Sequence, residues 1–234
     1  LDLSESGHQP MLSDDDRYII AFNGEIYNHL EIRQEIESFI STIIWKGHSD
    51  TETLLKAIQV FGWEKTLQKL VGMFAIALWD TEDKQLYLAR DRFGEKPLYY
   101  GLQGDTFLFG SELKPLTLHP AFEKELNNGA IGLLLKHGYI PTPYSVGNNI
   151  YKLPAAHYLV INESNLKPVL TCYWSFKDIV EASNSDKLKI NDHQAIENLE
   201  ELLTKSIKRQ MMSDVPLGAL LSGGIDSSLV VAIM

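Results

Sequence analysis

The stretch that decides the fold is Met73-Phe74-Ala75-Ile76-Ala77-Leu78-Trp79, followed by the polar segment Asp80-Thr81-Glu82-Asp83-Lys84 and a second apolar run at residues 86–89. Two apolar runs separated by a short polar segment are typical of a β-hairpin. Residues 98–101 and 106–109 repeat the pattern on either side of Gln103-Gly104-Asp105. The two hairpins together predict a domain built on antiparallel sheet.

Helices are predicted on the N-terminal side of these hairpins. Residues 17–22 predict a short buried strand, and Asn23-Gly24-Glu25 predicts a turn after it. Residues 29–38 carry apolar side chains at helical spacing. Ser49 followed by Glu52 has the spacing of a capping box, and the apolar face of Leu54, Leu55 and Ile58 comes next. Strands with helices beside them predict an α+β layered fold.

The C-terminal third predicts a change of domain. Helices are expected near residues 113–118 and 130–137, and closing strands at 150–161 and 169–174. The segment 175–191 is polar and poorly periodic, which predicts a linker. A helix capped by Asp192 and a strand at 215–221 should follow. The predicted domains are therefore residues 1–174 and 192–234, joined by the linker 175–191.

Composition excludes several classes of protein. Of the 234 residues, 44% are hydrophobic and 22% are charged, as in an ordinary globular protein. The net charge of −10 without a Lys/Arg cluster argues against nucleic acid as a partner. No apolar run reaches the roughly 18 to 20 residues that a membrane span needs. The single cysteine, Cys172, excludes an internal disulfide framework and favours the cytoplasm; we interpret it as a small buried hydrophobic residue.

The strongest motif is Ser222-Gly223-Gly224-Ile225-Asp226-Ser227, between a predicted strand and a predicted helix. Adjacent glycines let the backbone approach a ligand, and the N–H groups of a helix start favour an anion. These residues can therefore cradle a pyrophosphate group. The alternative is a Ser/Gly turn in which Asp226 caps the helix.

That loop resembles the pyrophosphate loop of ATP pyrophosphatases. Together with Ser213-Asp214-Val215-Pro216-Leu217-Gly218 it is similar to the glutamine-hydrolysing asparagine synthetase family. Other stretches of the chain resemble the same family in the same order, so the resemblance covers nearly the whole chain; they are Asn23-Gly24-Glu25-Ile26-Tyr27-Asn28 and residues 72–75, 78–80, 88–100, 111–114 and 138–141. The resemblance implies a glutaminase domain of the N-terminal-nucleophile type, followed by the first helix, strand and loop of an α/β ATP pyrophosphatase domain.

The resemblance also implies roles for particular residues. The side chain of Asn23 and the N–H of Gly24 would stabilise the oxyanion formed when glutamine is attacked. Glu25 and Asp50 would hold the amino group of glutamine. Taken alone, Asn23-Gly24 predicts a hairpin turn, and Asp50 a helix N-terminal acid. The residues that would contact ATP are Leu221, Ser222, Gly223, Gly224, Asp226 and Ser227. Magnesium is expected with ATP, although no residue of this chain is predicted as a metal ligand.

The charged residues between the two hairpins are given a structural role. We expect Arg90, Asp91, Arg92 and Lys96 to form ion pairs that hold the fold together.

The implied reaction makes asparagine from aspartate, with ammonia from glutamine and an aspartyl-adenylate as intermediate. AMP, pyrophosphate and glutamate would be the other products. The nucleophilic cysteine of the family is expected upstream of Leu1, so residues 1–234 are expected to be an inactive fragment of a longer cytoplasmic enzyme with a homodimer as its candidate assembly. Two alternatives stay open: an amidotransferase for another carboxylate, such as a sugar acid or a β-lactam precursor, and a non-catalytic binding module.

Overall fold

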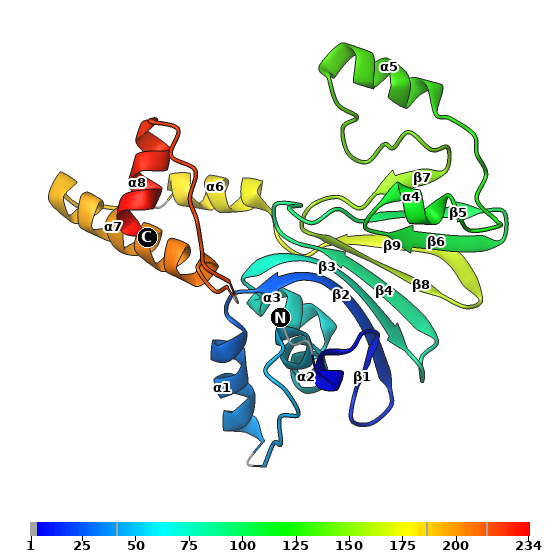
Figure 1. Ribbon diagram of the computed structural model, residues 1–234, viewed down its shortest axis with the longest axis horizontal. Helices are drawn as coiled ribbons and strands as arrows, with labels where there is room; N and C mark the ends of the chain where they lie inside the picture. Colours follow the sequence, from blue (N-terminus) through cyan, green and yellow to red (C-terminus); the bar gives the residue numbers. More distant parts are fainter. Residues whose placement is uncertain (1–3, 41, 186, 214) are drawn as a thin grey trace. The chain divides into compact units, whose positions relative to one another are not determined.

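The structure is a computed structural model that describes residues 4–40, 42–185, 187–213 and 215–234. The chain divides into two compact units, and the boundary between them lies after Ser175. The first unit carries two antiparallel sheets, and the second consists of helices (Figure 1).

The larger sheet of the first unit has six antiparallel strands in the order β1-β2-β3-β4-β8-β9. The predicted hairpin at residues 73–89 is confirmed, because β3 pairs with β4 from Asp80↔Gln85 to Ala75↔Arg90. The strands are β1 (Met11–Leu12), β2 (Tyr18–Ile26), β3 (Gly72–Asp80), β4 (Gln85–Arg90), β8 (His157–Asn162) and β9 (Asn165–Cys172).

The smaller sheet has three strands in the order β6-β5-β7. Its hairpin of β5 (Tyr99–Gln103) and β6 (Thr106–Gly110) confirms the second predicted hairpin. The single strand predicted at residues 150–161 is wrong, because β7 (Ile150–Lys152) belongs to this sheet and β8 to the other. Pro154 has no N–H to donate, and Ala156 has a φ of 58°, so the chain leaves one sheet and enters the other between them.

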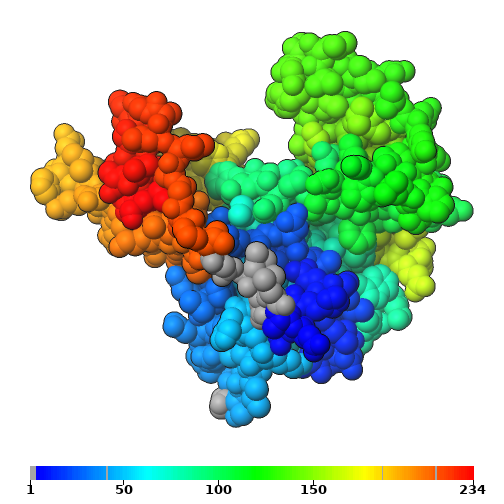
Figure 2. Space-filling model, viewed as in Figure 1, coloured from blue at the N-terminus to red at the C-terminus, as the bar shows by residue number. Residues whose placement is uncertain are grey.

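Helices cover one face of the larger sheet. The predicted helices are present as α1 (His29–Phe39) and α2 (Asp50–Phe61), and α3 (Trp63–Lys69) was not predicted. Ser49 caps α2 by accepting a hydrogen bond from the N–H of Thr51. A 3-10 turn (η1, Glu5–Gly7) precedes β1, and α4 (Leu113–Leu116) and α5 (Asn128–His137) confirm the two later helices. In Figure 2, α1 and α2 (blue to cyan) and the smaller sheet with α5 (green) lie at opposite ends of this unit.

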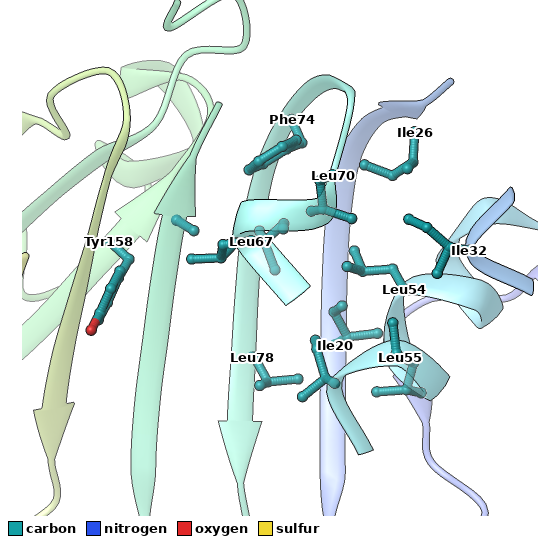
Figure 3. Packing of buried hydrophobic residues seen from close by; sticks show 14 of the residues in the cluster. Ile20, Ile26, Ile32, Leu54, Leu55, Leu67, Leu70, Phe74, Leu78 and Tyr158 are labelled. Carbon is teal, nitrogen blue, oxygen red and sulfur yellow. The ribbon is translucent and has the colours of Figure 1, made fainter. Parts of the chain in front are cut away.

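Two hydrophobic cores follow from the alternation of side chains along the strands. One core lies between the larger sheet and the helices, where Ile20, Phe74 and Leu78 meet Leu54 and Leu67 (Figure 3). The second core consists of the opposite-facing residues of the larger sheet and residues of the smaller one; its buried members are Ala75, Leu88, Leu98, Tyr100, Leu153, Leu159 and Ile161. The larger sheet is therefore covered on both faces.

The turn predicted at Asn23-Gly24-Glu25 is wrong, because β2 continues through these residues to Ile26. Gly24 pairs with Phe74 of β3 without a register shift. The two strands lie so close that a Cβ on Gly24 would stand 2.1 Å from the carbonyl oxygen of Met73. The glycine therefore permits a close approach of two backbones, and not a chain reversal.

The charged residues 90–96 stabilise the fold through backbone groups, so the predicted ion pairs are a wrong description of how they act. Arg90 donates to the carbonyl oxygens of Gly94, Lys96 and Leu153. The fully buried carboxylate of Asp91 accepts from four backbone N–H groups, those of Phe74, Phe93, Glu95 and Lys96. Arg92 donates to the carbonyl oxygens of Gln68 and Leu70. Among the described residues, no ion pair joins these four side chains to one another.

The interpretation of Cys172 as buried is also wrong. Cys172 is exposed, and its thiol lies 3.1 Å from the carbonyl oxygen of Trp174. It ends β9, an edge strand of the larger sheet whose side chains are mostly exposed. The neighbouring aromatic residues did not predict burial, because most side chains of this edge strand are exposed.

The second unit contains α6 (Phe176–Ser185), α7 (Asp192–Gln210) and α8 (Ile225–Ile233). Helix α6 occupies most of the segment predicted to be a linker, and Phe176, Ile179 and Val180 recur along it at helical spacing. Asn191, one residue before the predicted Asp192, is the N-cap of α7.

Residues 215–224 are irregular where a strand was predicted at 215–221. No neighbouring strand is described in this unit, so the backbone there has no ladder to join. In the described part of the chain, no helix is both long and apolar enough to cross a membrane.

Candidate active site

The outer edge of β2 presents a row of backbone N–H groups. The N–H of Phe22 donates to Gln9 Oε1 at 2.6 Å, and the N–H of Ile26 donates to Asp50 Oδ2 at 2.9 Å. Gly24 lies midway between them. N–H groups two residues apart in a strand project toward the same edge, so the N–H of Gly24 projects there as well.

The pairing of β2 with β3 leads to the same conclusion. Phe74, the partner of Gly24, donates its N–H to Asp91 Oδ2 and accepts from the N–H of Asp91. Both of its backbone groups therefore face β4, and Gly24 and Phe74 form a non-hydrogen-bonded pair. Among the described residues, the N–H of Gly24 has no partner. It is a donor fixed in direction and open to a ligand.

The side chain of Asn23 supplies a second donor beside the first. Asn23 is exposed. Ile20 and Ile26 face the core under the helices, and side chains alternate along a strand, so Asn23 lies on the opposite face. Its Nδ2 donates to the hydroxyl of Ser111, just beyond the end of β6, at 3.0 Å. One N–H of the amide is used in this contact, which leaves the other for a ligand. The amide of Asn23 and the backbone N–H of Gly24 are thus two donors on neighbouring residues of β2.

One carboxylate lies at the same edge of β2, and a second acidic residue belongs to the strand itself. Asp50, at the first position of α2, is half-buried and is tied to β2 by its bond from the N–H of Ile26. Glu25 adjoins Ile26 on the strand. Carboxylates beside open N–H donors can hold a group that carries both a cation and a developing negative charge. Asn23, Gly24 and Glu25 are consecutive residues of β2, and the structure brings Asp50 to the edge of the same strand.

Three neighbours of this edge were not given roles by the sequence. Gln9 joins β2 to α2, because it accepts from the N–H of Phe22 and donates to the hydroxyl of Thr51. Ser111 belongs to residues 111–114, which resemble the family, but the resemblance gives this residue no role. Burial lowers the pKa of His29, and the charge of Arg33 lowers it further. The nearby Asp50 raises it by less, so the pKa lies below its ordinary value.

The predicted ATP loop lies in the second unit. Gly223 has a φ of 80°, a conformation that favours glycine, and Gly224 is the N-cap of α8. No side chain caps this helix, so the alternative in which Asp226 caps it is wrong; Asp226 lies within the first turn. The hydroxyls of Ser222 and Ser227 lie 2.9 Å apart beside the helix start, and Leu221 is exposed just before them.

This loop fits an anionic group. Its N-terminal N–H groups have no side-chain cap, which is what an anion needs. The hydroxyls of Ser222 and Ser227 adjoin them and bond to each other and to the backbone of Gly224. Magnesium would need oxygen ligands such as carboxylates. Within the described ranges, no group of three or more His, Cys, Asp or Glu side chains could hold a metal ion.

Two family models match successive parts of the chain. Residues 1–174 match the family described as "Glutamine amidotransferase domain", and residues 198–234 match the family described as "Asparagine synthase". The "Asparagine synthetase [glutamine-hydrolyzing] 1" of Bacillus subtilis is 34% identical over 230 residues, which cover 98% of this chain and 34% of that protein. The chain spans less than half the length of the curated relatives it matches.

Solved structures support the fold. A glutamine phosphoribosylpyrophosphate amidotransferase from B. subtilis aligns with a TM-score of 0.51 at 20% identity, over 96% of this chain and 46% of that one. A structure titled as the allosteric regulatory enzyme of purine biosynthesis aligns with a TM-score of 0.54 at 20% identity, over 97% and 45%. The α+β layered, antiparallel glutaminase fold is thus confirmed. The chain belongs to the glutamine amidotransferase domain family, in the form that continues into an asparagine synthase segment.

Proposed function

We propose that the protein containing this chain makes asparagine from aspartate, with ATP as energy source and glutamine as nitrogen donor. The observation that carries the proposal is the edge of β2, where the open N–H of Gly24 and the amide of Asn23 lie near the carboxylate of Asp50, and Glu25 is the next residue of the strand. The asparagine synthase match that follows in the same chain supports aspartate as the acceptor.

In the first half-reaction a thiolate attacks the side-chain amide carbon of glutamine. The carbonyl oxygen becomes an oxyanion, which the N–H groups of Gly24 and Asn23 stabilise. Preorganised donors of this kind contribute about 3 kcal/mol each to the transition state. Collapse of the intermediate releases ammonia and leaves a thioester, which water hydrolyses to glutamate. Asp50 and Glu25 orient the substrate through its ammonium group.

In the second half-reaction the side-chain carboxylate of aspartate attacks the α-phosphorus of ATP, and pyrophosphate leaves. Ammonia then attacks the aspartyl-adenylate, so that asparagine forms and AMP leaves. The residues proposed to hold the phosphates of ATP are Ser222, Gly223, Gly224, Asp226 and Ser227, with Leu221 contributing its backbone. Magnesium, if bound with ATP, would neutralise phosphate charge.

The test uses the full-length protein with glutamine, aspartate and ATP. We expect asparagine, glutamate, AMP and pyrophosphate in equal amounts.

Asp50→Asn should raise KM for glutamine at least roughly 10-fold, because one charge pair with the ammonium group is lost, while synthesis from added ammonia continues. Ser227→Ala should do the reverse and weaken ATP use while sparing glutamine hydrolysis. Consumption of ATP with a sugar acid but not with aspartate would instead favour the alternative acceptor.

A further inference from the structure

The amide of Asn23 needs an external constraint. Asn23 is exposed at a strand edge, and an exposed Asn side chain can change rotamer and turn its amide away from the ligand. Only an amide held toward the ligand can donate an N–H to an oxyanion. The position of the side chain therefore decides whether Asn23 stabilises the oxyanion.

Ser111 is placed to supply that constraint. Gly110, the last residue of β6, pairs with Tyr99, and α4 begins at Leu113, whose turn carries the buried Leu116. Ser111 is thereby held between a strand and a helix of the smaller sheet layer. Its hydroxyl accepts from Asn23 Nδ2 at 3.0 Å. The contact joins residue 23 in one sheet to residue 111 beside the other.

We propose that Ser111 is a positioning residue that holds the side chain of Asn23 in place through this hydrogen bond, so that the second N–H of the Asn23 amide stays available to the oxyanion. This inference rests on the proposed hydrolysis of glutamine. Ser111 does not touch the substrate. It acts through Asn23, so its effect falls on the transition state, in which the oxyanion exists, more than on the bound glutamine.

The full-length protein carrying Ser111→Ala should hydrolyse glutamine with kcat lowered about 10-fold and KM within about two-fold, since complete loss of one oxyanion donor costs about 100-fold or more. Ser111→Thr keeps the hydroxyl and should restore most of the rate. Ser164→Ala, which removes an exposed hydroxyl from the β8–β9 turn, is the matched control and should leave kcat unchanged. Synthesis from added ammonia reports on folding and should be equal in all three variants.

A double-mutant cycle separates this proposal from a general structural role. If Ser111 acts through Asn23, then Ser111→Ala should add less than about two-fold to the loss already caused by Asn23→Ala. Two full, multiplying losses would overturn the proposal, as would an unchanged kcat in Ser111→Ala. An unchanged kcat in Asn23→Ala would overturn the proposed function itself, so the two failures are distinguishable.

Discussion

Gly24 lies at the closest approach of two strands, which makes its missing side chain a structural requirement. A Cβ there would stand 2.1 Å from the carbonyl oxygen of Met73 and 2.7 Å from the Cα of Phe74. Both atoms belong to the backbone of β3 and cannot move independently. We expect Gly24→Ala to lower the free energy of unfolding by about 3 kcal/mol, the upper range for overpacking, as measured by urea denaturation.

Gly132→Ala is the control for that prediction. Gly132 lies inside α5, and a Cβ there would meet no atom within 4 Å. Alanine is favoured over glycine in a helix by about 1 kcal/mol, so this variant should be as stable as the wild type or more so. Equal stability of the two variants would contradict our account of Gly24.

Asp91 offers a second test at the scale of one residue. Its Oδ1 accepts from the N–H groups of Phe93 and Glu95, and its Oδ2 from those of Phe74 and Lys96. In Asp91→Asn one oxygen becomes an NH₂ group, which would face two donors. We expect this isosteric change to cost about 3 kcal/mol in unfolding free energy, since buried donors lose their acceptor. A cost below about 0.5 kcal/mol, typical of surface sites, would contradict it.

The residue types of the candidate site could be predicted from the sequence, but their partners could not. Asn23, Gly24 and Asp50 belong to local patterns. The contact of Asn23 with Ser111 spans 88 positions, and that of Ile26 with Asp50 spans 24. Such contacts depend on how the sheets and helices assemble, which no local pattern encodes. The resemblance supplied roles for Asn23 and Gly24, whereas the pairing with Phe74 explains why that N–H is open.

At the scale of elements, the side chain of Arg17 links the start of β2 to the β3–β4 turn. Its guanidinium donates to both oxygens of the buried Asp80. The backbone N–H groups of Glu82 and Asp83 also bind that carboxylate. We expect Asp80→Asn to lower the unfolding free energy by about 2 kcal/mol at pH 7, because a buried charged pair is broken. Asp83→Asn, which removes an exposed partner of Arg17, should cost under about 0.5 kcal/mol.

The pH dependence of this pair has a definite sign. Burial raises the pKa of Asp80, but the hydrogen bonds from Arg17, Asp83 and Glu82 outweigh burial, so the pKa lies below the ordinary 3.8. A carboxyl whose pKa is lowered by folding stabilises the fold above its unfolded pKa and loses that contribution as the pH falls. The stability gap between wild type and Asp80→Asn should therefore be full above pH 5 and shrink below about pH 4. A gap that widens at low pH would contradict the assignment.

The elements themselves were predictable where local signals agreed with tertiary pairing. The hairpins of β3–β4 and β5–β6 followed from apolar runs around polar turns. The strand predicted at 150–161 failed because its two halves pair with different sheets, and periodicity cannot show which neighbour a strand will find. The strand predicted at residues 215–221 is absent for a related reason. A strand needs a partner, and its own residues do not provide one.

At the scale of the whole molecule, the two units differ in how much they bury. Every buried residue in the described part of the chain lies between Ser13 and Ile161, and α6, α7 and α8 contain none. Apolar side chains of α7 are instead exposed, among them Ile196 at 66% and Leu199 at 56%. Since helical stability in proteins comes chiefly from packing an apolar face, the second unit should open far more readily than the first.

Hydrogen exchange of residues 1–234 tests this difference directly. Backbone amides of α7 should exchange at least about 100-fold faster than those of β3, because a difference of about 3 kcal/mol in opening free energy separates packed from unpacked elements. Helix α2, whose apolar face is buried, is the internal control and should exchange slowly. Equal protection of α7 and α2 would contradict the prediction. In the full-length protein α7 should gain protection, because the proposed asparagine synthase domain would cover its apolar face; protection that stays low there would mean that this helix packs on no other part of the enzyme.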